Sequence, residues 1–158
     1  LNFALSAPGR VKRLILLAPA GALVPLTAQF YIRGMPILLF PIRPLITSFM
    51  RWMTVDGFVV NEAFVEQFVL GMKYFHLQIR LFPTVFTDCE LRRITAPTLL
   101  LVGGEEVIYN PEAAVTRARQ LLPNIEAEIV PNCGHGLTME QPALVNERVL
   151  RFLGQEAE

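Results

Sequence analysis

Residues 96–106 read APTLLLVGGEE, and this stretch decides the fold that we predict for the chain. Residues 98–102 form a nearly continuous apolar run, with a proline before it and two glycines after it. A short unalternating run of this kind is typical of a parallel strand buried on both faces, because each face then needs apolar side chains. We therefore expect a central strand here, ending in a loop with two acids.

Two other segments have strand character. Residues 11–17 end in the apolar run LILL, and residues 125–130 read IEAEIV. The alternation in the second segment places Glu126 and Glu128 on one face, so we expect an edge strand with that face in water. Helices are predicted between and after the strands, with one beginning at Asn110-Pro111 and a final one at Gln141-Pro142. The inward-facing residues expected on the final helix are Leu144, Val145, Val149, Phe152 and Leu153.

Strands that are joined by helices predict an α/β fold: a partial parallel sheet of about three strands, flanked by helices and connected by right-handed crossovers. Residues 23–93 differ in character, since they hold most of the aromatic residues and show helical spacing. We expect residues 1–22 and 94–158 to form the α/β core and residues 23–93 to form an inserted helical segment. Within it, an apolar stripe at helical spacing indicates either core packing or an apolar wall facing a substrate. The stripe consists of Phe64, Phe68, Met72 and Phe75.

Charge and composition exclude several classes of function. The 158 residues carry 14 basic and 14 acidic side chains, so no net charge draws the chain to nucleic acid or to an anionic membrane. The hydrophobic fraction of 53% is high, which indicates either membrane association or part of a larger protein; we favour the second. The longest uncharged stretch, residues 14–32, contains Pro19, Gly21 and Pro25, which disfavour a spanning helix.

Cysteine and histidine usage is sparse. Cys89 and Cys133 are too few for a disulfide framework and fit a reducing compartment, so we expect a cytoplasmic protein. With only His76 and His135 besides, no metal-ligand spacing is present, and we expect neither a metal nor a cofactor.

Polar residues follow the second and third predicted strands. Glu105 and Glu106 leave the second strand, and the loop Asn132-Cys133-Gly134-His135-Gly136 leaves the third. Because the carboxyl ends of parallel strands meet at one edge of the sheet, the acids and the imidazole converge there. A carboxylate beside a histidine forms the base-and-orienter pair of nucleophilic catalysis. His135 and one of the two acids, Glu106 or Glu105, are the candidate catalytic residues, and a resemblance to a known family implies Glu106.

Three segments resemble the sixth, seventh and eighth strand regions of α/β-hydrolase proteins, of the esterase and lipase kind. In that family the catalytic acid follows strand seven in a Gly-x-x-Asp pattern, and the catalytic histidine follows strand eight in a Gly-His loop. Gly134-His135 matches the second pattern; Gly103 and Glu106 match the first in spacing, with Glu in place of the usual Asp. The resemblance also places residues 23–93 as the variable helical cap between strands six and seven. The three segments are RVKRLILLAPAG (10–21), APTLLLVGGEEVIYNPEAA (96–114) and PNCGHGLTMEQPALVNERVLRFL (131–153).

The family's nucleophile motif, Gly-x-Ser-x-Gly, is missing: Ser6 and Ser48 have no such context. Since residues 1–14 resemble the end of the helix after that motif, we expect a C-terminal fragment that is inactive alone. Its parent would be a serine hydrolase acting on esters of apolar small molecules, although Asp and Cys nucleophiles remain open. Cys133 is expected to be a small core filler. The residues expected to line the pocket are Val107, Leu137, Phe40 and Trp52.

Two alternatives to an enzyme remain at this point. The chain could be a non-catalytic binding member of the fold, or its apolar cap could contact lipid surfaces. As partners we expect a second copy of the chain or the missing N-terminal half, which would pair with the open edge of the strand at residues 11–17.

Overall fold

The computed structural model describes residues 1–74 and 83–154, and its centre is a parallel sheet with strand order β1-β2-β3. The strands span Leu14–Leu17 (β1), Thr98–Gly103 (β2) and Ile125–Val130 (β3). They begin level with one another, because Leu14 and Ile125 both lie opposite Thr98. The predicted three-stranded parallel sheet is therefore confirmed. The first strand starts three residues later than expected, since β2 begins at Thr98 and offers residues 11–13 no ladder partner.

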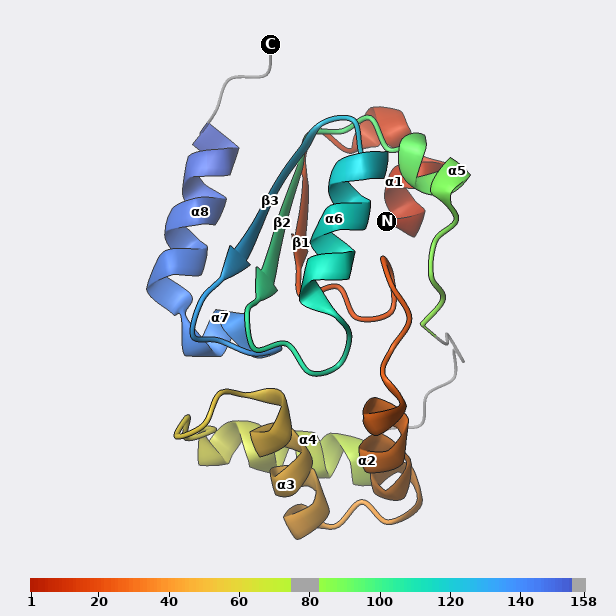
Figure 1. Cartoon of the computed structure of the whole chain (residues 1–158). Coiled ribbons are helices and arrows are strands. Elements are labelled where there is room, and N and C mark those ends of the chain that lie inside the picture. Colours follow the sequence, from red (N-terminus) through yellow and green to blue (C-terminus); the bar gives the residue numbers. More distant parts are fainter. Residues whose placement is uncertain (75–82, 155–158) are drawn as a thin grey trace.

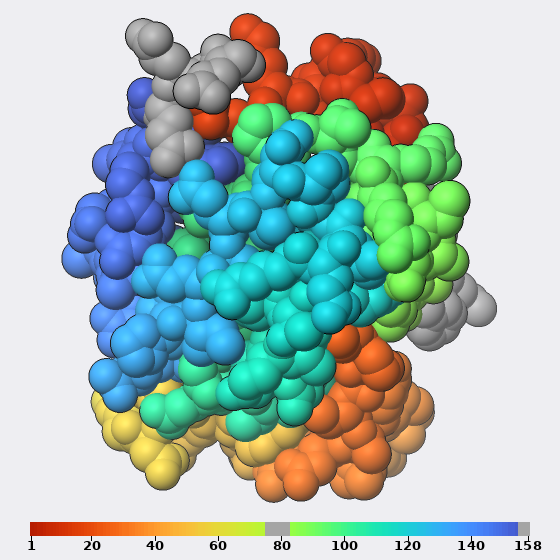
Figure 2. Space-filling view, turned by 45° about the horizontal axis from the view of Figure 1, so that its top comes forward, coloured from red at the N-terminus to blue at the C-terminus, as the bar shows by residue number. Residues whose placement is uncertain are grey.

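Helices cover both faces of the sheet and the carboxyl ends of its strands. Figure 1 shows α6 on one face, α8 on the other, and α2, α3 and α4 forming a helical layer beyond the strand ends. In the space-filling view, residues that precede α6 lie directly against this helical layer (Figure 2). The helical elements are α1 (Asn2–Ser6), the 3₁₀ turn η1 (Pro8–Arg10), α2 (Ala28–Leu39), α3 (Arg43–Met53), α4 (Glu62–Tyr74), α5 (Asp88–Arg92), α6 (Pro111–Leu121), α7 (Leu137–Glu140) and α8 (Pro142–Gly154).

Strand β2 contributes side chains to two hydrophobic cores, one on each face of the sheet. All six residues of β2 are buried, and their side chains alternate between the two faces, as in any strand. Leu100 and Val102 pack in the core beneath α6, whereas Leu99 and Leu101 pack in the core beneath α8. This double burial explains why residues 98–102 show no polar alternation in the sequence.

The start of α6 agrees with its sequence signals. The Asn110 side chain accepts a hydrogen bond from the Ala113 amide at 2.7 Å, and Pro111 occupies the first helical position, where no donor is needed. Because β2 ends at Gly103 and α6 begins at Pro111, the loop that carries Glu105 and Glu106 spans residues 104–110.

Two expectations about α8 and β3 need correction. Leu153 is 50% exposed, because it follows the buried Phe152 and so points about 100° away from it around the helix. The face of β3 that carries Glu126 and Glu128 is only partly exposed to water, since Glu128 forms an ion pair with Arg148 of α8 at 2.8 Å. Glu126 is exposed as predicted.

The helical layer has a small core of its own, separate from those of the sheet. On α4 the fully buried residues are Val65 and Val69, while Phe64 is 41% exposed and Phe68 and Met72 are partly buried. The stripe is therefore divided: Phe68 and Met72 pack at the border of the small core, whereas Phe64 is largely exposed. Phe75, the last member of the predicted stripe, lies outside the described residues.

The chain enters and leaves the helical layer at one place, which we call the neck and define by Ala22, Leu23 and Phe86. The Phe86 amide donates to the Ala22 carbonyl at 3.0 Å. Arg117 of α6 donates to the carbonyls of Leu23 and Phe86 and forms an ion pair with Asp88 at 2.6 Å. The hydrogen bond from Arg117 lowers the pKa of Asp88. One guanidinium thus holds both ends of residues 23–86.

We predict that Leu101→Ala lowers the free energy of unfolding by about 2–5 kcal/mol, because it opens a cavity in a well-packed core. Leu101 is 0% exposed, whereas Leu150 of α8 is 68% exposed and serves as the matched control. Urea unfolding followed by circular dichroism measures both variants. An equal loss in the two variants would contradict the packing described for β2.

Candidate active site

The structure brings one predicted acid into contact with the predicted base. The Nδ1 atom of His135 lies 2.7 Å from Oε2 of Glu106, although the residues are 29 positions apart in the chain. Glu105 is exposed and does not make this contact. Of the two candidate acids, Glu106 is therefore the one that faces the imidazole.

Burial makes the Glu106 carboxylate dependent on its partners. Its side chain is 0% exposed, and a buried carboxylate is stable only when hydrogen bonds replace water. Oε1 accepts the amide proton of Ile108 at 2.8 Å, which leaves Oε2 directed at His135. Each carboxylate oxygen thus has one defined partner, so the acid is fixed in orientation.

The contact also defines the histidine tautomer. With a carboxylate at Nδ1, the neutral ring carries its proton there, and Nε2 is the free basic nitrogen. Within residues 1–74 and 83–154, Nε2 has no hydrogen-bond partner, and the side chain is 26% exposed. The arrangement can therefore accept a proton from a group placed beside Nε2.

Close approach of two backbones holds the acidic and histidine loops together. A Cβ atom on Gly103 would lie 2.2 Å from the carbonyl oxygen of Gly134, which leaves no room for any other residue. Beside this contact, the amides of Gly104 and Glu105 donate to the carbonyls of Val130 and Cys133 at 2.8 and 3.0 Å. The loops after β2 and β3 are thus extensions of the ladder between these strands.

The histidine loop also docks on the end of α3, which the sequence did not reveal. The His135 amide donates to the Met53 carbonyl at 2.8 Å. The Glu140 carboxylate accepts the amide protons of Val55 at 2.7 Å and of Gly134 at 3.1 Å. A Cβ on Gly134 would lie 2.5 Å from the Met53 oxygen, so glycine is required here too. No sequence pattern indicated this contact with α3.

Tyr109 is a further buried neighbour of the pair. It is 2% exposed, and its ring meets the His135 ring edge-on, with 6.5 Å between centroids. Burial raises the pKa of its hydroxyl, and the nearby charge of Glu106 adds to the effect. Tyr109 therefore stays neutral and fills buried space beside Glu106 and the His135 ring.

The residues expected to line a pocket are not all brought together. Val107 and Trp52 border a hollow of about 390 Å³ beside Glu106, which Arg51, Thr54, Asp56 and Glu105 also line. Leu137 instead is 1% exposed within the core beneath α8, because it opens α7 and points inward. Phe40 is 64% exposed at the end of α2 and is not among the residues around this hollow. The hollow thus combines an aromatic wall with charged groups.

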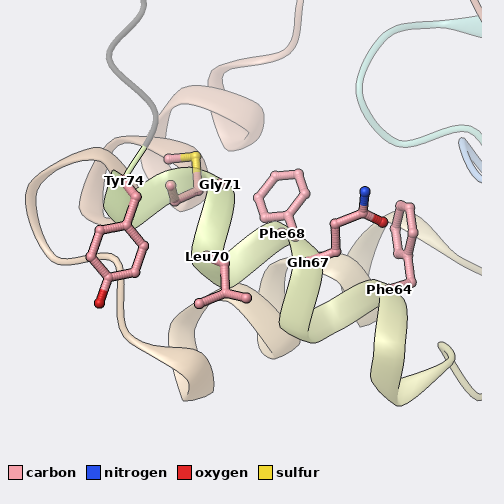
Figure 3. A pocket seen from close by; sticks show the side chains of 7 residues that line it. Phe64, Gln67, Phe68, Leu70, Gly71 and Tyr74 are labelled. Carbon is pink, nitrogen blue, oxygen red and sulfur yellow. The ribbon is translucent and has the colours of Figure 1, made fainter.

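A larger hollow, of about 670 Å³, lies along α4 and away from the acid–base pair. Figure 3 shows Phe64, Phe68 and Tyr74 projecting from the helix around it. Its walls are almost entirely apolar, and none of its lining residues belongs to the hollow beside Glu106.

No nucleophile stands beside His135 among the described residues. Ser6 and Ser48 are both exposed, and Cys133 points into the core, where its thiol donates to the Val130 carbonyl at 3.3 Å. The described residues contain no group of three or more side chains suited to a metal ion. They also contain no helix long and apolar enough to cross a bilayer.

Most of this sequence matches a known protein family. The model of the family described as "Alpha/beta hydrolase family" matches residues 2–148. The chain belongs to this family. Membership confirms the resemblance that was drawn from the loops of Glu106 and His135.

Relatives of the alpha/beta hydrolase chain include named carboxylesterases of Bacillus subtilis (strain 168). "Uncharacterized carboxylesterase nap" is 41% identical over 162 residues, which cover 99% of this chain and 53% of that protein. "Carboxylesterase YbfK" is 39% identical over 97% of this chain and 53% of its own length. The crystal structure of carboxylesterase CesB (YbfK) superposes with a TM-score of 0.89 at 37% identity, covering 99% and 56% of the two chains. The chain thus spans about half the length of the curated relatives it matches.

We predict that Cys133 is unreactive in the folded protein while Cys89 reacts. Burial raises the pKa of the Cys133 thiol to about 11, so the reactive thiolate is scarce near neutral pH, whereas Cys89 is exposed. Ellman's reagent at pH 7.5 should titrate one thiol per folded chain and two in guanidinium chloride. Rapid native titration of two thiols, reduced to one in Cys133→Ala, would contradict this placement.

Proposed function

We propose that this chain supplies the general base and its orienting acid to a carboxylesterase active site. The observation that carries the proposal is the 2.7 Å contact between His135 Nδ1 and the buried Glu106 carboxylate. The names of the Bacillus subtilis relatives support ester bonds as the target.

The roles of the pair follow from its geometry. His135 would accept the proton of a nucleophilic hydroxyl at Nε2 and return it to the leaving alcohol. Glu106 would hold the ring through Nδ1 and stabilise the imidazolium that forms after the proton transfer. Because Glu106 is fixed by the Ile108 amide, the ring cannot rotate without breaking a buried charge-assisted hydrogen bond.

The nucleophile and the oxyanion donors would come from the remainder of a longer chain. This part of the proposal is supported by the length of the relatives and by the positions of Ser6 and Ser48 away from the histidine. We further propose that residues 23–93 act as a cap over the site and that the ester carries an apolar group, which would pack against Trp52 and Val107.

We predict that, in the longer protein, His135→Ala lowers kcat/KM for p-nitrophenyl esters by about 10⁴-fold or more, since the base is lost. Glu106→Gln should cost roughly 10²–10⁴-fold, because an amide group favours the wrong tautomer of the imidazole. Glu126→Gln is the matched control, with a change of less than about threefold expected from an exposed side chain on β3 that does not line the hollow. Wild-type rates in both His135→Ala and Glu106→Gln would refute the assignment.

We also predict that the 158-residue chain alone shows no ester turnover above that of buffer. A base without a nucleophile or oxyanion donors has nothing to activate. The assay compares the purified chain with its His135→Ala variant at equal concentration. Turnover that exceeds buffer and disappears in the variant would show that this chain holds a nucleophile of its own.

A further inference from the structure

Glu140 lies close to the active-site histidine without touching its ring. It is the last residue of α7, and Gly136 precedes this helix as its N-cap. Side chains of a helix lean toward its N-terminus, so a residue four positions after Gly136 lies back over the loop that precedes the helix. A Cβ on Gly136 would lie 3.1 Å from Oε2 of Glu140, which shows how closely the carboxylate covers the loop.

The two oxygens of Glu140 bind different parts of the fold. Oε2 accepts the amide proton of Gly134, the residue before His135, at 3.1 Å. Oε1 accepts the amide proton of Val55, two residues beyond the end of α3, at 2.7 Å. One partly buried carboxylate therefore links the histidine loop to the helical layer by two charge-assisted hydrogen bonds.

A third bond makes this link specific to the histidine. The His135 amide donates to the carbonyl of Met53 at 2.8 Å, so residues 53–55 and 134–135 are joined directly by one hydrogen bond and indirectly by the two bonds to Glu140. Glu106 fixes the imidazole ring, but it cannot fix the backbone that carries the ring. Glu140 acts on this backbone through the amide of Gly134.

We propose that Glu140 is a positioning residue: it holds the His135 backbone against the end of α3, and so sets the place of the imidazole relative to Glu106. The inference rests on the proposed function, in which His135 is the base. The hollow beside Glu106 is close to this link, because Thr54 and Asp56, which flank Val55 in the chain, are among its lining residues.

The first test measures the chain itself and does not depend on catalysis. In Glu140→Gln and Glu140→Ala, the amides of Val55 and Gly134 should exchange with deuterium about 10- to 100-fold faster, as expected for the loss of a charge-assisted hydrogen bond. The amides between β2 and β3 should exchange at the wild-type rate. Glu147→Gln is the matched control, because Glu147 is 66% exposed and its ion pair with Arg148 lies on the surface.

A second measurement separates positioning from simple support of the fold. The chain has two histidines, so nitrogen-15 labelling of histidine yields a small set of ring signals. The hydrogen-bonded Nδ1 proton of His135 should shift or broaden in the Glu140 variants and stay unchanged in Glu147→Gln. In the longer protein, Glu140→Gln should lower kcat by about 10-fold or more and change KM by less than about threefold.

Three results would overturn the inference. One is wild-type exchange at both amides; another is faster exchange with an unaltered His135 ring signal. The third is loss of protection throughout β2 and β3 in both variants, which would make Glu140 a general support of the fold. If instead the longer protein has no esterase activity while the exchange and ring signals change as expected, the positioning role stands and the proposed function fails.

Discussion

The site depends on the near contact of two backbones at Gly103. The carbonyl of Gly134 occupies the space that any side chain on Gly103 would need, and this contact joins the ends of β2 and β3. Packing of such density tolerates no insertion of an atom without a shift of the backbone. The loops that carry Glu106 and His135 are thus brought together by main-chain packing, and the side-chain contacts then fix the imidazole within this frame.

The carboxylates of Glu106 and Glu140 bind different kinds of donor near His135. Glu106 is buried and bonded to one amide and one imidazole, so its charge acts at short range on the His135 ring. Glu140 is partly buried and bonded only to amides, so its charge stabilises backbone structure. Glu105, exposed beside the hollow, does neither. The different environments of these three glutamates are therefore defined by burial and by the donors that Glu106 and Glu140 meet.

Much of the fold was predictable, because it depends on local patterns. The apolar run at residues 98–102 indicated a strand buried on both faces, and Asn110-Pro111 indicated a helix start. Glu106 and His135 could be paired because parallel strands bring their ends together. The rest required three-dimensional information. No spacing rule connects Glu140 with Val55 across 85 positions, and nothing in the sequence showed that Leu137 packs inward while Phe40 faces solvent.

The neck at Ala22 and Phe86 bears on how such a molecule can change over evolutionary time. The two ends of the segment between Ala22 and Phe86 are joined by a hydrogen bond and by Arg117. The distance between these ends is therefore fixed, whatever the length of the chain between them. The entropy of closing a loop grows only with the logarithm of its length. Residues could therefore be gained or lost among these helices at little thermodynamic cost to the strands, provided that the end of α3 keeps its hydrogen bonds to the histidine loop.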